Sequence, residues 1–350
     1  MSDSDPSSII SNISFHRRTT LETKHGLLTV SFADIGCPTG PVLLYLPGMF
    51  ASRYLGIPMH TLAIRAGIRL LVVDRPGMGC STDVPLAERI DAWIDILPRL
   101  LSYLNIQRVS LASHSAGTIY LLNTWERCPE LVTPNIFFMA PWVDIAHSQM
   151  TSMQMLQYIP EKAFSLWHHI PRFFVKKASP VLASSGTLLR SIAPSTSEEE
   201  DRTFLDANWR RLERDYGVPR KEAAELTNLV AQYMFTENTV GANSEALQCV
   251  RKGDGGNWGV CSDYAVCARR LVERAQLEGH GASGARIWAY HATKDAMVGS
   301  RGPKYFDGCW DVAVSGSKSS FESRTVEGTD HDTVCQAVEV WEEILSAVSG

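Results

Sequence analysis

The sequence Val109-Ser-Leu-Ala-Ser-His-Ser115-Ala-Gly117 joins an apolar run to an amphipathic stretch through the pattern Ser-x-Ser-x-Gly. This pattern predicts a sharp turn between a buried strand and a helix, with Ser115 at its apex. Small residues two positions before and after Ser115 allow the strand and helix backbones to approach closely. Such a turn exposes the serine hydroxyl and directs the positive end of the following helix toward it. Because plain turns also match five-residue patterns, the flanking strand and helix are what mark Ser115 as a candidate nucleophile.

Short apolar runs of this kind recur along the first 145 residues and alternate with amphipathic stretches. The alternation is typical of strands separated by crossover helices. Strands that are apolar on both faces belong inside a parallel sheet with helices on both sides. Strands are expected at Ile13–Thr20, Leu27–Phe32, Val42–Leu46, Leu70–Val73, Val109–Ala112 and Asn135–Met139. Helices are expected near residues 55–67, 87–104 and 116–128.

The pattern changes between residues 145 and 255, where helical patterns predominate. Ser197 and Glu200 form a capping box that would begin one helix, and Arg220–Phe235 is expected to form another. The alternation of strands and helices then returns, with elements expected at Arg286–Tyr290, Ser323–Val326 and Thr333–Val348.

These patterns divide the 350 residues into a first core part at 1–144, a helical cap at 145–255 and a second core part at 256–350. Hydrophobic residues make up 45% of the chain and charged residues 20%, which is enough apolar material for a large core. We therefore predict an α/β protein with a mostly parallel central sheet, flanking helices and an inserted helical cap.

Charge and hydropathy argue against several classes of function. The net charge is −5, without a block of Lys or Arg, which argues against binding to a phosphate backbone. No apolar run approaches the roughly 20 residues that a membrane-spanning helix needs, and residues 1–8 lack the features of a signal peptide. The eight cysteines and ten histidines show no spacing typical of a metal site. We expect a cytoplasmic protein with no metal, cofactor, disulfide, nucleic-acid partner or membrane span.

Four further segments, together with the Ser115 turn, resemble motifs of the α/β-hydrolase superfamily. In chain order, the five motifs lie at Leu46–Arg53, Asp74–Ser81, Ser113–Gly117, Trp288–Asp295 and Gly328–Asp332. The first two resemble the family's strand-end loop His-Gly-x-x-Gly-Ser-Arg and its loop D-R-P-G-x-G-x-S. The third resembles the nucleophile turn, and the last two resemble the loops that carry the triad acid and the triad histidine. Five motifs in the family's order are far more specific than any one of them. The resemblance extends from about residue 27 to residue 350.

The resemblance implies a catalytic triad of Ser115, His331 and Asp295. A serine hydroxyl is a poor nucleophile unless a base removes its proton during attack. His331 would be that base, and Asp295 would fix its tautomer and stabilise the imidazolium. Asp144, which also follows a predicted strand, is an alternative for the acid.

The same resemblance implies that the backbone N–H groups of Met49 and Ala116 form an oxyanion hole for the developing negative charge. Two positions depart from the family pattern. Pro47 stands where a histidine usually precedes the oxyanion glycine, and Ser113 stands where the nucleophile turn usually has its first glycine. Neither change removes a backbone donor, but Pro47 removes a hydrogen bond behind the loop. We therefore expect this loop to be held differently and the activity to be weak or specialised.

The first part of the expected cap is rich in methionine and aromatic side chains, which predicts an apolar pocket over the strand ends. These side chains are Met150, Met153, Met155, Leu156, Tyr158, Phe164, Trp167, Phe173 and Phe174. About half of them are expected only to hold the cap to the core. The candidate pocket residues are Phe50, His114, Met153 and Trp167, with a structural role as the alternative for His114. The composition favours a medium-sized apolar ester or thioester over a sugar, a phosphate or a charged peptide.

The leading hypothesis is a serine hydrolase of the carboxylesterase type, which forms an acyl-enzyme on Ser115 and releases it with water. Secondary metabolism is one setting for such an enzyme. The same triad also serves acyl transfer and C–C bond hydrolysis, and both stay open. A non-hydrolytic binder or receptor and a cofactor-free cyclase are further alternatives on the same fold. Haloalkane dehalogenases and epoxide hydrolases are disfavoured, because their nucleophile is an aspartate and residue 115 is serine.

Overall fold

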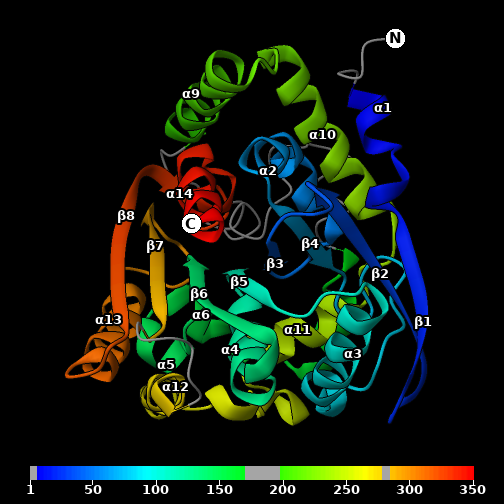
Figure 1. Cartoon of the computed structure of the whole chain (residues 1–350). Helices are drawn as coiled ribbons and strands as arrows, with labels where there is room; N and C mark the ends of the chain where they lie inside the picture. The colour runs from blue at the N-terminus through cyan, green and yellow to red at the C-terminus, as the bar shows by residue number, and fades with distance from the viewer. Residues whose placement is uncertain (1–5, 170–197, 278–283) are drawn as a thin grey trace.

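A computed structural model of the chain describes residues 6–169, 198–277 and 284–350, and a single sheet runs through its centre (Figure 1). The strands lie in the order β1-β2-β4-β3-β5-β6-β7-β8. They are β1 (Arg17–Thr23), β2 (Gly26–Gly36), β3 (Val42–Leu46), β4 (Arg69–Val73), β5 (Val109–His114), β6 (Val132–Met139), β7 (Arg286–Lys294) and β8 (Ser320–Asp330). Strand β2 pairs antiparallel with β1 and β4, and the pairings from β4 to β8 are parallel. The arrangement confirms the predicted α/β fold with a mostly parallel sheet.

Helices cover both faces of this sheet (Figure 1). They are α1 (Pro6–Ile10), α2 (His60–Ala66), α3 (Arg89–Tyr103), α4 (Gly117–Arg127), α5 (Ile145–Ser148), α6 (Thr151–Leu156), α9 (Glu198–Tyr216), α10 (Arg220–Thr236), α11 (Gly241–Cys249), α12 (Tyr264–Leu277), α13 (Arg301–Val314) and α14 (Val338–Ser349). Successive strand residues point to opposite faces, so Leu43 and Leu44 of β3 belong to two different apolar clusters. The cluster of Leu44 packs against α3, α4, α12 and α13, and that of Leu43 against α2, α10 and α14.

Several elements differ from the sequence-based expectation. Residues 13–15 form a 3₁₀ turn, and β1 begins only at Arg17. Pro58 has no N–H to donate, and the helix expected at 55–67 starts as the 3₁₀ segment Arg53–Met59 before α2 begins. Helices α12 and α13 were not predicted. The sequence of α13 includes two glycines and a proline, which weaken a helical pattern, so packing against the core must hold this helix.

The described residues between 145 and 255 form helices and turns, apart from one isolated bridge between Gly79 and Asn238. Helix α9 packs against β8 and α14, and α10 packs against α1 and the segment Arg53–Met59. The expected capping residue Ser197 and the side chains of residues 173 and 174 lie outside the described ranges. The division into core and cap stays a prediction.

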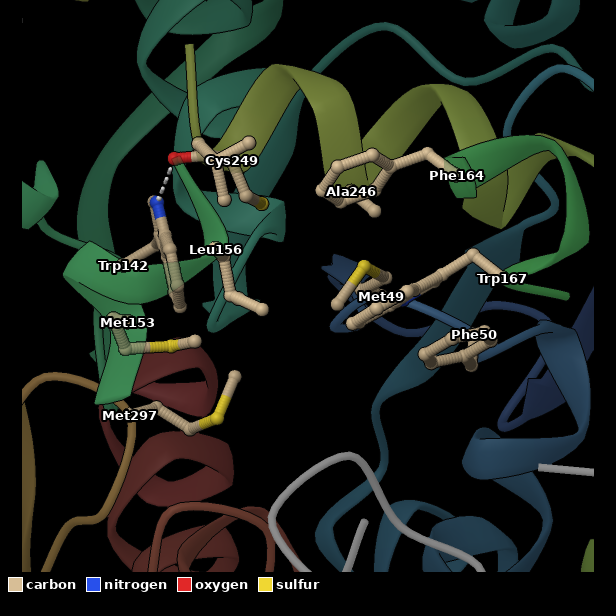
Figure 2. Close-up of a pocket in the computed structure, with 11 residues that line it drawn as sticks. Met49, Phe50, Trp142, Met153, Leu156, Phe164, Trp167, Ala246, Cys249 and Met297 are labelled. Atoms are coloured by element: carbon tan, nitrogen blue, oxygen red, sulfur yellow. Dashed lines mark hydrogen bonds between the residues drawn. The ribbon is translucent and has the colours of Figure 1, made fainter. Parts of the chain in front are cut away.

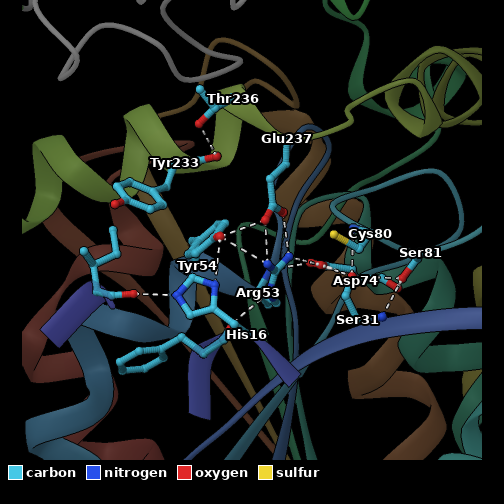
Figure 3. Close-up of polar contacts among 12 residues, drawn as sticks. His16, Ser31, Arg53, Tyr54, Asp74, Cys80, Ser81, Tyr233, Thr236 and Glu237 are labelled. Atoms are coloured by element: carbon cyan, nitrogen blue, oxygen red, sulfur yellow. Dashed lines mark hydrogen bonds and ion pairs between the residues drawn. The ribbon is translucent and has the colours of Figure 1, made fainter. Parts of the chain in front are cut away.

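A buried ion-pair network fastens the end of α10 to the core (Figure 3). The guanidinium of Arg53 lies 2.6 Å from the Asp74 carboxylate and 2.7 Å from that of Glu237. Glu237, which directly follows α10, also accepts a hydrogen bond from the Tyr54 hydroxyl at 2.8 Å, and the Ser31 hydroxyl donates to Asp74. Arg53 and Asp74 are buried, so removing one of them would leave an uncompensated charge in the core. The network therefore fixes α10 against the loops that follow β3 and β4.

Gly117, at the start of α4, should tolerate no side chain. An added Cβ would lie 2.1 Å from the carbonyl oxygen of Leu46, at the end of β3, and no flexible side chain is there to give way. We expect Gly117→Ala to reduce the free energy of unfolding by about 3 kcal/mol or more. Guanidinium unfolding of the variant and the wild type measures this difference.

Gly308→Ala in α13 is the matched control, because a Cβ at Gly308 meets no atom within 4 Å. It should leave the stability unchanged or raise it by up to about 1 kcal/mol, since alanine has the higher helix propensity. If Gly117→Ala were as stable as the wild type, the close contact between β3 and α4 would be refuted.

Candidate active site

Ser115 occupies the turn between β5 and α4 in a strained backbone conformation. Its φ of +48° lies in the left-handed region, which residues other than glycine rarely adopt. The Ser115 N–H donates to the Met139 carbonyl at 3.1 Å, and the Ser115 carbonyl accepts the Trp142 N–H at 3.3 Å. Strain of this kind persists only where the surroundings enforce it. The end of β6 therefore helps to hold the Ser115 hydroxyl in place at the carboxyl end of β5.

His331 and Asp295 reach Ser115 because their strands are neighbours in the sheet. The register of β7 and β8 pairs Lys294 with Asp330, so the next residues, Asp295 and His331, leave adjacent strand ends together. The Nδ1 of His331 lies 2.7 Å from Asp295 Oδ2, and its Nε2 lies 2.7 Å from Ser115 Oγ. The structure thus brings the three predicted triad residues into one hydrogen-bonded series.

The buried imidazole and carboxylate stabilise each other's charged forms. Burial by itself lowers the pKa of His331, but the charge and hydrogen bond of Asp295 outweigh burial and raise this pKa to about 9. Burial likewise raises the pKa of Asp295. The charge and hydrogen bond of His331, with the N–H groups of Val298 and Met297, outweigh this effect and lower the pKa below its ordinary value. Asp295 is therefore ionised and accepts the Nδ1–H of His331.

Asp144, the alternative acid, is engaged elsewhere. Its Oδ1 accepts the Ala146 N–H at 2.9 Å and so caps α5. Its Oδ2 forms an ion pair with Arg251 at 2.6 Å. The structure therefore places Asp295, and not Asp144, against His331.

The loop after β3 lies against the Ser115 turn. A Cβ on Gly48 would lie 2.8 Å from the His114 ring and 3.3 Å from the Ser115 Cβ, so glycine is needed for this approach. Among the residues that the structure describes, no hydrogen bond engages the N–H of Met49 or of Ala116. Both amides lie in the turns next to the serine and have a free proton to donate to an anionic oxygen.

An apolar pocket adjoins these residues (Figure 2). The space among its side chains measures about 400 Å³, part of it open to solvent, and the lining residues are Met49, Phe50, Trp142, Met153, Leu156, Phe164, Trp167, Ala246, Cys249, Val250 and Met297. Met49 comes from the loop beside Ser115 and lies between the two sides of the pocket (Figure 2). The ring of Trp142 is edge-on to that of His331, with 6.5 Å between centroids. The pocket therefore lies beside the loop next to Ser115 and the ring of His331.

Three of the four pocket residues predicted from the sequence line this pocket, namely Phe50, Met153 and Trp167. His114 does not line it. Its ring is buried with its centroid 5.4 Å from that of His331, and its Nε2 donates to the His331 carbonyl oxygen at 2.7 Å. His114 is thus a structural neighbour of His331, the alternative role that the sequence left open.

The remaining cap side chains divide between the pocket and the surface. Leu156 and Phe164 line the pocket, whereas Met155 and Tyr158 are exposed. Sequence reasoning missed Trp142, Ala246, Cys249, Val250 and Met297 as lining residues. Trp142 follows the end of β6 and Met297 follows the end of β7, and this position at strand ends is a signal that could have identified both. No local signal marks Ala246, because its place depends on how α11 packs.

The described residues hold no group of three or more His, Cys, Asp or Glu side chains placed to bind a metal ion. All eight cysteines are free thiols, and six of them are buried. Within residues 6–169, 198–277 and 284–350, no helix combines the length and the apolar character that crossing a membrane requires.

A model of the alpha/beta hydrolase family matches residues 43–331, a range that includes Ser115, Asp295 and His331. Comparison with curated proteins finds no match. Similar solved structures include a carboxylesterase structure from the ammonia-oxidizing thaumarchaeon Nitrososphaera gargenis, 14% identical over 94% of this chain and 97% of that chain, with a TM-score of 0.54. The esterase RhEst1 from Rhodococcus sp. ECU1013 is 14% identical over 95% of this chain and 98% of its own, with a TM-score of 0.55. The thioesterase domain from the curacin biosynthetic pathway is 11% identical over 94% and 98%, with a TM-score of 0.52. At these identities, the likeness shows a shared fold.

The His331 imidazole should titrate with a midpoint near pH 9 in the folded protein, because the Asp295 carboxylate favours its protonated form. Asp295→Asn removes this charge but keeps the burial, so the midpoint should fall clearly below that of the wild type, even though Asp332 and Asp330 still favour the protonated form. Histidine side-chain NMR spectra over a pH series measure the midpoint. Asp144→Asn is the control and should leave it unchanged. A midpoint that stays near 9 in Asp295→Asn would contradict the assigned pair.

Proposed function

Because the chain belongs to the alpha/beta hydrolase family, we propose that it is a serine hydrolase that cleaves an ester or thioester of a medium-sized apolar substrate. One observation carries the proposal: the hydrogen-bonded series of Ser115, His331 and Asp295 adjoins a pocket lined by apolar side chains. A hydroxyl within hydrogen-bond reach of a base, which is itself oriented by a carboxylate, is the arrangement that activates serine.

In the proposed reaction, the neutral form of His331, whose share grows as the pH rises toward 9, takes the proton of Ser115 as the serine oxygen attacks the acyl carbon. The Nδ1–H of His331 stays hydrogen-bonded to Asp295, whose negative charge stabilises the imidazolium. The N–H groups of Met49 and Ala116 stabilise the oxyanion of the tetrahedral intermediate. His331 then protonates the departing alcohol or thiol, which leaves an acyl group on Ser115. A water molecule deprotonated by His331 attacks this ester, and the acid and the free serine are released.

The lining of the pocket supports an apolar substrate. Binding there removes apolar surface from water, whereas a sugar or a phosphate would lose its hydration without gaining polar side chains as partners. The similar structures named above are esterases and a thioesterase domain, which supports this type of bond.

The origin of the lining residues supports a substrate-binding role for the segment at 145–255. This segment contributes Met153, Leu156, Phe164, Trp167, Ala246, Cys249 and Val250. The remaining lining residues come from the proposed core, and Met49 and Met297 among them lie next to the reacting groups. A substrate chain would thus extend from the ester group beside Ser115 to the side chains of the cap.

Ser115→Ala should reduce kcat/KM for p-nitrophenyl esters by about 10⁴-fold or more, because no hydroxyl remains to form the acyl-enzyme. A fluorophosphonate probe should label the wild-type chain, and peptide mapping should locate the adduct on Ser115. The Ser115→Ala variant should take no label.

Ser113→Ala is the matched control. It removes a hydroxyl from the same turn, and this hydroxyl is buried without a hydrogen-bond partner among the described residues. The control should keep both labelling and turnover. A folded wild-type chain that takes no label would overturn the proposal in favour of a non-hydrolytic binder or a cofactor-free cyclase. Product analysis with an added alcohol separates hydrolysis from acyl transfer.

Leu156→Trp should shift the preference toward shorter acyl chains, because the indole would fill part of the pocket from α6. In a series of p-nitrophenyl esters from acetate to decanoate, kcat/KM for the longest chains should fall by roughly 10- to 100-fold, with little change for acetate.

Met155→Trp is the control for this variant. Met155 is the neighbouring residue on α6, but its side chain is 64% exposed and does not line the pocket. It should keep the wild-type chain-length profile. An unchanged profile in Leu156→Trp would mean that the acyl chain does not bind in this pocket.

A further inference from the structure

The loop that carries Met49 needs an anchor other than its own sequence, because Pro47 has neither an N–H nor a polar side chain. Arg75 provides one, since its guanidinium donates to the carbonyl oxygens of Pro47 and Gly48, the latter at 2.8 Å. Phe50, in the same loop, has a φ of +65°, a conformation that residues other than glycine rarely adopt. The loop is therefore held in a shape that its own residues do not favour.

The hydrogen bond from Arg75 to the Gly48 carbonyl acts on the same peptide group that carries the Met49 N–H, the proposed oxyanion donor. The Gly48 carbonyl and the Met49 N–H belong to the same planar trans peptide group, so its oxygen and hydrogen point in opposite directions. An arginine that fixes the carbonyl also fixes the direction of the N–H, and its charge strengthens the N–H as a donor. We propose that Arg75 is a positioning residue that aims the Met49 N–H at the acyl oxygen of the substrate. This assignment rests on the proposed hydrolase function.

Arg75 is itself fixed by a carboxylate from α11. Glu245 binds it at two points, with Oε1 2.6 Å from Nε and Oε2 2.9 Å from Nη2. The two side chains are 1% and 0% exposed. The guanidinium also lies over the ring of Tyr120, 5.1 Å from its centroid. Planar, two-point binding of this kind suits arginine and cannot be reproduced by lysine.

A second arginine completes this buried cluster. Arg89 Nη2 lies 3.3 Å from Glu245 Oε1, and Arg89 Nη1 lies 3.2 Å from Asp83. Removal of Arg75 or Glu245 alone would leave a charge unpaired in the core and endanger the fold. Replacement of both by apolar side chains leaves Arg89 paired with Asp83 and leaves no unpaired charge at Arg75, so it separates an effect on the loop from an effect on stability.

Two variants test the assignment. Arg75→Lys keeps the charge but loses the fork of donors, and the double variant Arg75→Met with Glu245→Leu removes the ion pair without leaving a lone charge. Both should lower kcat by roughly 10- to 100-fold and leave KM within about twofold, because a misaimed donor weakens only transition-state binding. An alkyl boronic acid forms a tetrahedral adduct with serine, so its affinity should fall by the same factor. Binding of 1-octanol, which has no oxyanion, should stay unchanged.

Asp34→Asn is the control. It removes the carboxylate that pairs with Arg17 and with Arg69 at the opposite end of β4, and it should change neither kcat nor boronate affinity. Thermal unfolding of each variant shows that it is folded. The positioning role is overturned if the folded double variant keeps the wild-type kcat, or if octanol binding falls together with boronate binding. Either result would leave the proposed hydrolase function standing, as long as wild-type turnover depends on Ser115. A wild-type chain without such turnover would overturn the proposed function and, with it, this inference.

Discussion

The close backbone contact between the end of β3 and the start of α4 is the constraint on which the rest of the site depends. An added Cβ at Gly117 would lie 2.1 Å from the Leu46 carbonyl oxygen, so the two backbones meet with no side chain between them. The contact brings the loop after β3 against the turn after β5. The proposed oxyanion site, which combines the amides of Met49 and Ala116 from two separate loops, requires this contact.

Buried ion pairs then connect this centre to the end of α10 and to α11, the second of which lines the pocket. Arg53 follows β3 and Arg75 follows β4, and each binds a carboxylate from the segment after α10, Glu237 and Glu245 respectively. Breaking one partner of such a pair costs about 3–5 kcal/mol, because the other charge stays desolvated. The α11 wall of the pocket is thus fixed to the loop after β4, and the end of α10 to the loop after β3. Their relative position is set by paired charges as well as by apolar contact.

Much of the fold and the centre of the site could be predicted from the sequence, because both depend on local patterns at strand ends. Continuous apolar runs marked the strands of the sheet, and the order of motifs singled out Ser115, Asp295 and His331, which the structure brings together. The features that the sequence missed depend on packing between distant segments. His114 contacts the His331 backbone only once the loop after β8 has folded against β5. Ala246 lies in the pocket wall only once α11 has packed against the core. No local pattern encodes either one.

Selectivity at this site must come mainly from shape. The lining of the pocket is mainly apolar, and of its two indole N–H groups that of Trp142 already donates to the Cys249 carbonyl. The polar partners of the proposed ester would therefore be mainly the backbone amides and the triad. Each methylene that a pocket accepts or excludes changes binding by about 1–3 kcal/mol, whereas a site built to hydrogen-bond a substrate hydroxyl can discriminate far more strongly. Met49, Met153 and Met297 also have flexible side chains, which adapt to irregular chains. We therefore infer a graded preference for chain length over strict recognition of one functional group.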